Sequence, residues 1–141
     1  MLRRLAHYSV RAADLAISIA FYTDVLGLKV GPRPPFSFPG AWLYLDGDGL
    51  NEQGCVHLIG TEDEQALEHY LGAGGPAGAH TGALDHIAFL AGDWAGTRRR
   101  LRDRGVPFAD RVAPILGVRQ VFLTDPDGMT IELNFPEAAA V

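Results

Sequence analysis

Residues 7–14 read HYSVRAAD, and residues 86–93 read HIAFLAGD. In both stretches a His begins an apolar run typical of a β-strand, and seven residues later comes an Asp suited to cap a helix. A helix-like segment follows each Asp and ends at a Gly, Gly27 in the first half and Gly105 in the second. The spacing therefore predicts one structural module that occurs twice.

Each module is expected to contain a strand, a helix and three further strands. The first has strands over 4–10, 28–32, 41–46 and 54–60 and a helix over 15–26; the second has strands over 83–90, 106–112, 118–124 and 129–135 and a helix over 93–104. The last two strands are joined by Asp-Pro-Asp-Gly at 125–128, a tight-turn sequence. This order predicts an α+β fold with two βαβββ modules.

The chain has 141 residues, which suits a single domain over 1–141. Module one spans about 4–60, a connector with a short helix over 62–70 spans 61–82, and module two spans 83–136. The net charge of −5 argues against nucleic acid as a partner. A single Cys, Cys55, fits a reducing cytoplasm, and the N-terminal MLRRLAHYSV indicates neither a signal peptide nor a membrane span.

Four residues at repeat-related positions predict a metal site. His57, in CVHLI, closes the first half, and Glu132, in TIELNF, closes the second at nearly the same offset, beside the paired His7 and His86. Strand alternation places each of the four on the less apolar face of its strand. Imidazole and carboxylate suit Fe²⁺, Mn²⁺, Ni²⁺, Co²⁺ or Zn²⁺. The alternative is that each His is a half-buried structural residue, but an unpaired carboxylate within an apolar strand is costly.

These residues sit in motifs that resemble the vicinal oxygen chelate superfamily, which includes glyoxalase I, bleomycin- and fosfomycin-resistance proteins, methylmalonyl-CoA epimerase and extradiol dioxygenases. The motifs span residues 4–136 and are His7 with Asp14, FYTDVLGLKV, AWLYL, VHLI, LDHIAF and FLTDPDGMTIEL. The resemblance implies that the two modules form a cupped mixed sheet, with metal ligands from the first and last strands of each module.

The resemblance also suggests roles for the four residues. His7, His86 and Glu132 match the shared two-His-one-Glu ligand set, and Glu132 is a candidate catalytic residue as well. At the place of His57, glyoxalase I is expected to have a Glu that is ligand and base, and the epimerase a Gln. In extradiol dioxygenases a His near this place is an acid–base group beside the substrate. His57 is therefore either a fourth ligand or an acid–base group.

The sequence thus predicts a cytoplasmic, divalent-metal-dependent enzyme that chelates a small oxygenated substrate. A lyase or isomerase of the glyoxalase kind is favoured because the chain has one module pair, whereas extradiol dioxygenases usually have two. Ring-cleaving dioxygenation is the runner-up. A metal-independent antibiotic-binding protein and a fosfomycin-type thiol transferase rank lower. The partners are expected to be a small-molecule substrate and a second copy in a homodimer, with no membrane and no nucleic acid.

Overall fold

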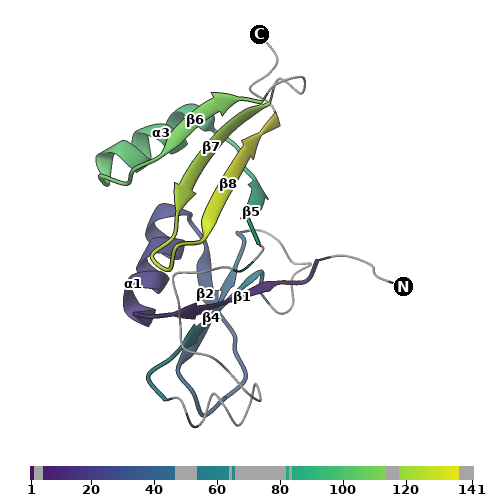
Figure 1. Ribbon diagram of the computed structural model, residues 1–141, viewed down its shortest axis with the longest axis vertical. Helices are drawn as coiled ribbons and strands as arrows, with labels where there is room; N and C mark the ends of the chain where they lie inside the picture. Colours follow the sequence, from purple (N-terminus) through teal and green to yellow (C-terminus); the bar gives the residue numbers. More distant parts are fainter. Residues whose placement is uncertain are drawn as a thin grey trace. The chain divides into compact units, whose positions relative to one another are not determined.

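The computed structural model describes residues 5–46, 54–63, 84–113 and 118–136, together with residues 1, 65 and 82. It divides into two compact units, Met1–Gly78 and Ala79–Val141, and each contains one of the repeated modules (Figure 1). Of the helix predicted over 62–70, residues 64 and 66–70 lie outside the described residues.

The elements follow the predicted order in both units. The first unit contains β1 (Tyr8–Ala12), α1 (Leu15–Ala20), the π-helical turn η1 (Phe21–Val25), β2 (Lys29–Gly31), β3 (Gly40–Tyr44) and β4 (Val56–Gly60). The second contains β5 (His86–Leu90), α3 (Trp94–Asp103), β6 (Ala109–Val112), β7 (Arg119–Thr124) and β8 (Thr130–Phe135). None of the helices in the described ranges is long and apolar enough to cross a membrane.

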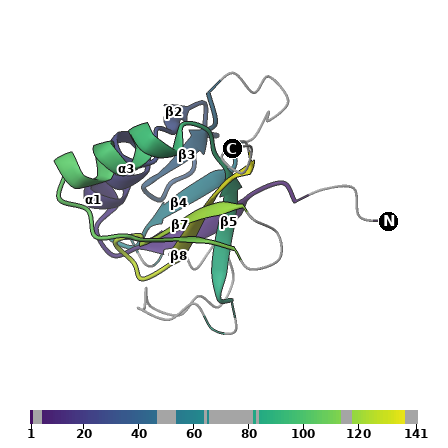
Figure 2. The ribbon, with the colours of Figure 1, turned by 90° about the horizontal axis from the view of Figure 1, so that it is seen from above.

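The two sheets have the same topology. Their strand orders are β1-β4-β3-β2 and β5-β8-β7-β6, with the first strand of each module parallel to its last and the other pairs antiparallel. In both units the last strand is therefore central and the first lies at an edge, as Figure 1 shows for β5 and β8; Figure 2 gives the view from above. The predicted α+β fold with two βαβββ modules is confirmed.

Both predicted helix starts and both predicted stops are confirmed. The Asp14 carboxylate accepts a hydrogen bond from the Ile17 amide, and the Asp93 carboxylate accepts one from the Gly96 amide, at 3.1 and 3.0 Å. Gly27 and Gly105 follow the helices with φ of +79° and +65°, the left-handed region in which a helix ends most readily at Gly.

The helices cover the apolar faces of the sheets, away from the candidate ligands. In the first unit the Tyr8 hydroxyl donates to that of Tyr22 on η1 at 3.2 Å, and Tyr8 shares its face with the buried Val56. In the second unit the Arg98 guanidinium on α3 lies 2.7 Å from the Asp110 carboxylate on β6, on the face opposite Gln120. The other face of each sheet is therefore left for a site.

Most strands begin or end one to four residues from the predicted boundaries, and two of the differences have identifiable reasons. The helix predicted over 15–26 changes from α to π at Phe21, and its π-helical part, which ends at Val25, buries Tyr22 and Val25. β1 begins at Tyr8 rather than at residue 4, because its partner β4 begins only at Val56 and the first bond between them runs from the Tyr8 amide to the Cys55 carbonyl. His7 consequently lies just before β1.

The predicted turn at 125–128 is confirmed and is held by one carboxylate. Asp125 is 4% exposed, and its Oδ1 accepts hydrogen bonds from the amides of Asp127 and Met129 at 2.9 and 2.8 Å. Gly128 supplies the positive φ, +89°. The turn therefore fixes the register of β7 against β8, and hence the neighbours of Glu132.

Replacement of Asp125 by Ala should destabilise the fold by about 2 kcal/mol, because the buried amide of Met129 and the part-buried amide of Asp127 lose a charged acceptor. Urea unfolding of Asp125→Ala and wild type measures the difference in free energy of unfolding. Asp103→Ala, an exposed carboxylate at the end of α3, is the matched control and should change stability little. Equal losses in both variants would contradict this role of Asp125.

Candidate metal centre

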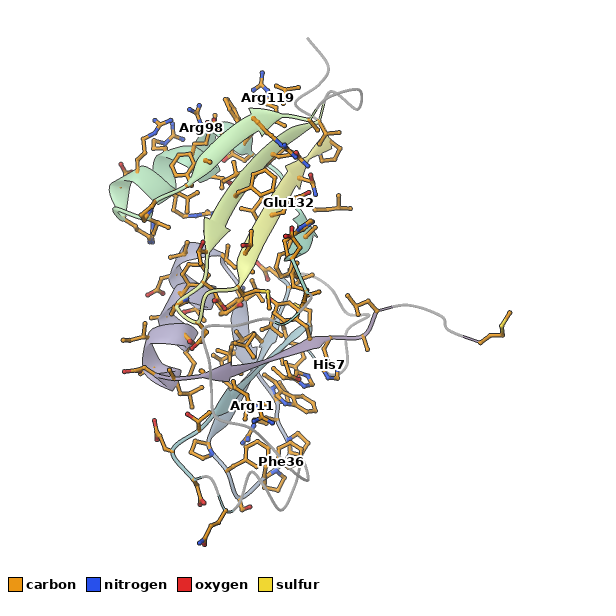
Figure 3. The ribbon with its side chains drawn as sticks, in the orientation of Figure 1. His7, Arg11, Phe36, Arg98, Arg119 and Glu132 are labelled. Carbon is orange, nitrogen blue, oxygen red and sulfur yellow. The ribbon has the colours of Figure 1, made fainter. Side chains whose placement is uncertain are left out.

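In the first unit, His57 is the middle ring of a three-ring stack. It lies on central strand β4, opposite Trp42 on β3. The Trp42 and His57 ring centroids are 4.0 Å apart with planes within 5°, and those of His7 and His57 are 3.8 Å apart with planes within 16°. His57 is 7% exposed, and both faces of its imidazole are covered by the neighbouring rings. Figure 3 shows His7 among the side chains of this unit.

This stack does not place both imidazoles around one ion. An imidazole binds a metal in its own ring plane, through a nitrogen lone pair at about 2.0–2.1 Å. An ion in the plane of His57 would lie well out of the plane of the parallel His7 ring, so one ring would have to turn for both to bind it. His7 Nδ1 is buried and has no hydrogen-bond partner among the described residues. Of these two imidazoles, His7 therefore has a ring nitrogen that could bind a cation.

In the second unit, His86 and Glu132 form a pair with the spacing of two metal ligands. Ala88 on β5 stands opposite Glu132 on β8, so His86 is the diagonal neighbour of Glu132 on the same face. His86 Nε2 lies 3.2 Å from Glu132 Oε2. Two ligand atoms bound to one ion at usual bond lengths and angles lie roughly 3 to 3.5 Å apart. These two residues thus fit a divalent cation without rearrangement.

Asp85 orients the His86 ring. Its Oδ2 lies 2.8 Å from His86 Nδ1, and with the proton placed on Nδ1 the Nε2 lone pair is free to face Glu132. The hydrogen bond to Asp85 raises the pKa of His86, burial opposes the increase, and the Glu132 charge adds to it. Because a second proton on Nε2 blocks a metal ion, metal binding through His86 weakens as the pH falls through this raised pKa.

Glu132 is 8% exposed, although it carries a carboxylate. Its Oε1 accepts hydrogen bonds from Gln120 Nε2 on β7 at 2.9 Å and from Asn134 Nδ2 on β8 at 2.7 Å. Its Oε2 is the oxygen that faces His86. The two carboxylate oxygens therefore have different surroundings.

A mostly apolar cavity of about 370 Å³ opens on the same face of this sheet. Two of its residues flank the ligand pair, since Phe122 stands opposite Glu132 and Thr130 stands opposite His86. The cavity is lined by Pro107, Phe108, Ala109, Phe122, Leu123, Thr124 and Thr130. It could hold an apolar substituent of a molecule bound at the pair.

The four predicted site residues are thus found as two pairs, one in each unit. Over the described ranges, no group of three or more His, Cys, Asp or Glu side chains is gathered in a way that could hold a metal ion. The four-residue site therefore stays a prediction. Sequence reasoning did not identify Asp85, Gln120 or Asn134, although Asp85 directly precedes His86 in the sequence.

Comparison with known proteins places these features in context. The profile of the Glyoxalase/Bleomycin resistance protein/Dioxygenase superfamily matches residues 4–133. The lactoylglutathione lyase of Salmonella typhimurium is 31% identical over 136 residues, covering 92% of this chain and 90% of that protein.

Solved structures share the fold at lower identity. A lactoylglutathione lyase from Agrobacterium tumefaciens has a TM-score of 0.65 at 20% identity, covering 98% of this chain and 97% of its own. An antibiotic binding protein from Streptomyces has a TM-score of 0.63 at 23% identity, covering 96% and 98% of the two chains.

In the metal-free protein, Asp85→Asn should lower the pKa of His86, because the neutral amide no longer stabilises the imidazolium. An NMR titration of the imidazole carbon-bound protons measures it. Asp103→Asn removes an exposed charge elsewhere in the same unit and should leave the His86 titration in place. An unchanged pKa in Asp85→Asn would contradict the role given to Asp85.

Proposed function

The chain belongs to the Glyoxalase/Bleomycin resistance protein/Dioxygenase superfamily, and on that premise we propose that it is a divalent-metal-dependent lyase or isomerase of the glyoxalase kind. The proposal is supported by relatives about 30% identical over nine-tenths of the chain that are lactoylglutathione lyases. The observation that carries it is the His86–Glu132 pair, with Nε2 and Oε2 3.2 Å apart and Asp85 behind the imidazole.

In this proposal His86, Glu132 and His7 hold the ion. Two imidazoles and one carboxylate would leave coordination positions open for two adjacent oxygens of a substrate. A bound divalent cation stabilises the negative charge that develops on those oxygens when a proton leaves the neighbouring carbon. Metal binding requires an unprotonated Nε2, and Asp85 supports this tautomer by accepting a hydrogen bond from Nδ1–H. Because the same hydrogen bond raises the pKa of His86, the ion is held only at a pH above that pKa.

His57 is the proposed acid–base group. Its ring is held between His7 and Trp42, so a nitrogen at its edge can accept a proton from the substrate carbon and return it to the adjacent carbon. An imidazole suits this transfer near neutral pH. The stack supports this role over the role of fourth ligand, because the parallel rings of His7 and His57 do not share an ion as they lie.

The substrate class follows from the chelating oxygens and the apolar cavity beside Glu132. A hemithioacetal, the adduct of a thiol and a 2-oxoaldehyde, carries two adjacent oxygens, a transferable proton and an organic substituent. The cavity lined by Phe122 and Phe108 is the proposed place for the substituent. Because no glutathione-binding signature is recognised in the sequence, the thiol itself is left open. We further propose a cytoplasmic homodimer.

Ring cleavage by a dioxygenase is the second candidate, because the proposed ligand set is also the two-His-one-carboxylate set of non-haem iron oxygenases. The two reactions differ in their need for oxygen. A lyase or isomerase works without oxygen and accepts Ni²⁺, Co²⁺ or Zn²⁺. A dioxygenase requires Fe²⁺ or Mn²⁺, consumes oxygen and turns catechols yellow.

Untagged protein purified without chelator should contain close to one divalent ion per site, and His86→Ala should lose most of it, because the ion loses an imidazole ligand. Elemental mass spectrometry measures both. Glu132→Gln should lose metal as well, while Glu62→Gln, an exposed carboxylate in the other unit, should retain it. Absence of metal in wild type even after reconstitution would leave a metal-independent binding protein.

His57→Ala should retain metal but isomerise a hemithioacetal at least about 100-fold more slowly in kcat, the range of a general base. An oxygen-free assay of the metal-loaded enzyme measures kcat, and elemental mass spectrometry measures retention. Cys55→Ala, two residues before His57 in the sequence, is the control and should keep both. Loss of metal in His57→Ala would instead make His57 a ligand.

A further inference from the structure

The Glu132 carboxylate belongs to a connected network of four polar side chains on three neighbouring strands. Gln120 Nε2 donates to Glu132 Oε1 at 2.9 Å and to Asn134 Oδ1 at 2.9 Å. Asn134 Nδ2 donates to the same Glu132 Oε1 at 2.7 Å. Arg111 on β6 donates from Nε to Gln120 Oε1 at 2.9 Å. Both hydrogens of the Gln120 amide and its oxygen are therefore used.

The direction of these hydrogen bonds is determined by Arg111. A guanidinium can only donate, so the Gln120 group that faces it must be the carbonyl oxygen. The Gln120 amide nitrogen must then face Glu132 and Asn134. The cross-strand register produces this arrangement, since Arg111 stands opposite Gln120 and Gln120 stands opposite Asn134. The network thus presents two N–H donors to one chosen oxygen of Glu132.

The network leaves the second oxygen of Glu132 for another partner. Oε1 accepts two hydrogen bonds, so both of its lone pairs are occupied, while Oε2 lies 3.2 Å from His86 Nε2. A carboxylate with one oxygen saturated by neutral donors can offer a cation only the other oxygen. Gln120 and Glu132 are each 8% exposed. Burial of a carboxylate and its polar partner costs desolvation free energy, which two apolar side chains at the same positions would not cost. The arrangement therefore has a use beyond packing.

We propose that Gln120 and Asn134 are positioning residues that restrict Glu132 to a single-oxygen ligand, through Oε2, of the ion held with His86. This inference rests on the proposed function and adds the coordination mode of one ligand and the residues that impose it. A further consequence is that Oε1 is not available to accept a proton from the substrate. Glu132 would then act as a ligand only, and His57 would be the group that transfers the proton.

A purely structural role predicts a different outcome from a positioning role. If the amides only satisfy a buried carboxylate, their removal lowers the stability of the fold and leaves the coordination of a bound ion unchanged. If they position Glu132, their removal frees Oε1, and the carboxylate can bind through both oxygens or turn away. The visible absorption spectrum of bound Co²⁺ reports this change, because its bands depend on coordination number and geometry.

The experiment titrates Co²⁺ into metal-free wild type, Gln120→Met and Asn134→Leu, and records calorimetric affinity and the visible spectrum. Each variant keeps the approximate side-chain volume and removes the donors. We expect affinity about 10–100-fold weaker in both variants, the usual effect of residues that orient a ligand, together with a changed Co²⁺ spectrum. Gln65→Met makes the same chemical change at an exposed position in the other unit and should match wild type.

Thermal unfolding checks that each variant is folded. Because Gln120 and Asn134 lie on different strands, the test still works with one variant if the other does not fold. Folded variants with wild-type affinity and an unchanged spectrum would overturn the positioning role and leave the proposed function standing, provided His86→Ala loses Co²⁺. Wild type that binds no Co²⁺ would overturn both. Co²⁺ binding by wild type thus separates a failure of this inference from a failure of the proposed function.

Discussion

The burial of one carboxylate constrains the rest of the second unit. Glu132 lies on the central strand β8 between the apolar Ile131 and Leu133, and its charge cannot stay there without partners. The strand order supplies them from both sides, Gln120 from β7 and His86 from β5. The tight turn at Asp125 fixes the register that brings Gln120 and Asn134 to the same oxygen. Turn, register and polar network thus depend on one another.

The two modules use the same topology for different chemistry. The position that holds Glu132 on β8 corresponds in the repeat to His57 on β4, which lies between two rings rather than among amide donors. In the proposed function the two positions have different roles: Glu132 is a ligand of the ion, together with His86 and His7, whereas His57 transfers a proton.

Much of the fold could be predicted from the sequence because its signals are local. The His-to-Asp spacing, the capping carboxylates at Asp14 and Asp93 and the positive-φ glycines all act within a few residues, and these predictions are confirmed. The sequence did not predict the π-helical turn, because the residues within it, such as Thr23, are equally compatible with an ordinary α-helix. In the structure the Thr23 hydroxyl donates a hydrogen bond to the Ile19 carbonyl. Strand alternation placed His57 and Glu132 on the correct faces. It could not identify Gln120, because which residues stand opposite one another depends on strand order and register.

Anomalous diffraction from crystals of the Co²⁺-loaded protein would test the account most directly. The account predicts a single strong peak at about 2.0–2.2 Å from both His86 Nε2 and Glu132 Oε2, with Oε1 still bonded to Gln120 and Asn134 and His57 outside bonding distance. No peak at this pair, with metal-loaded crystals diffracting well, would contradict the account.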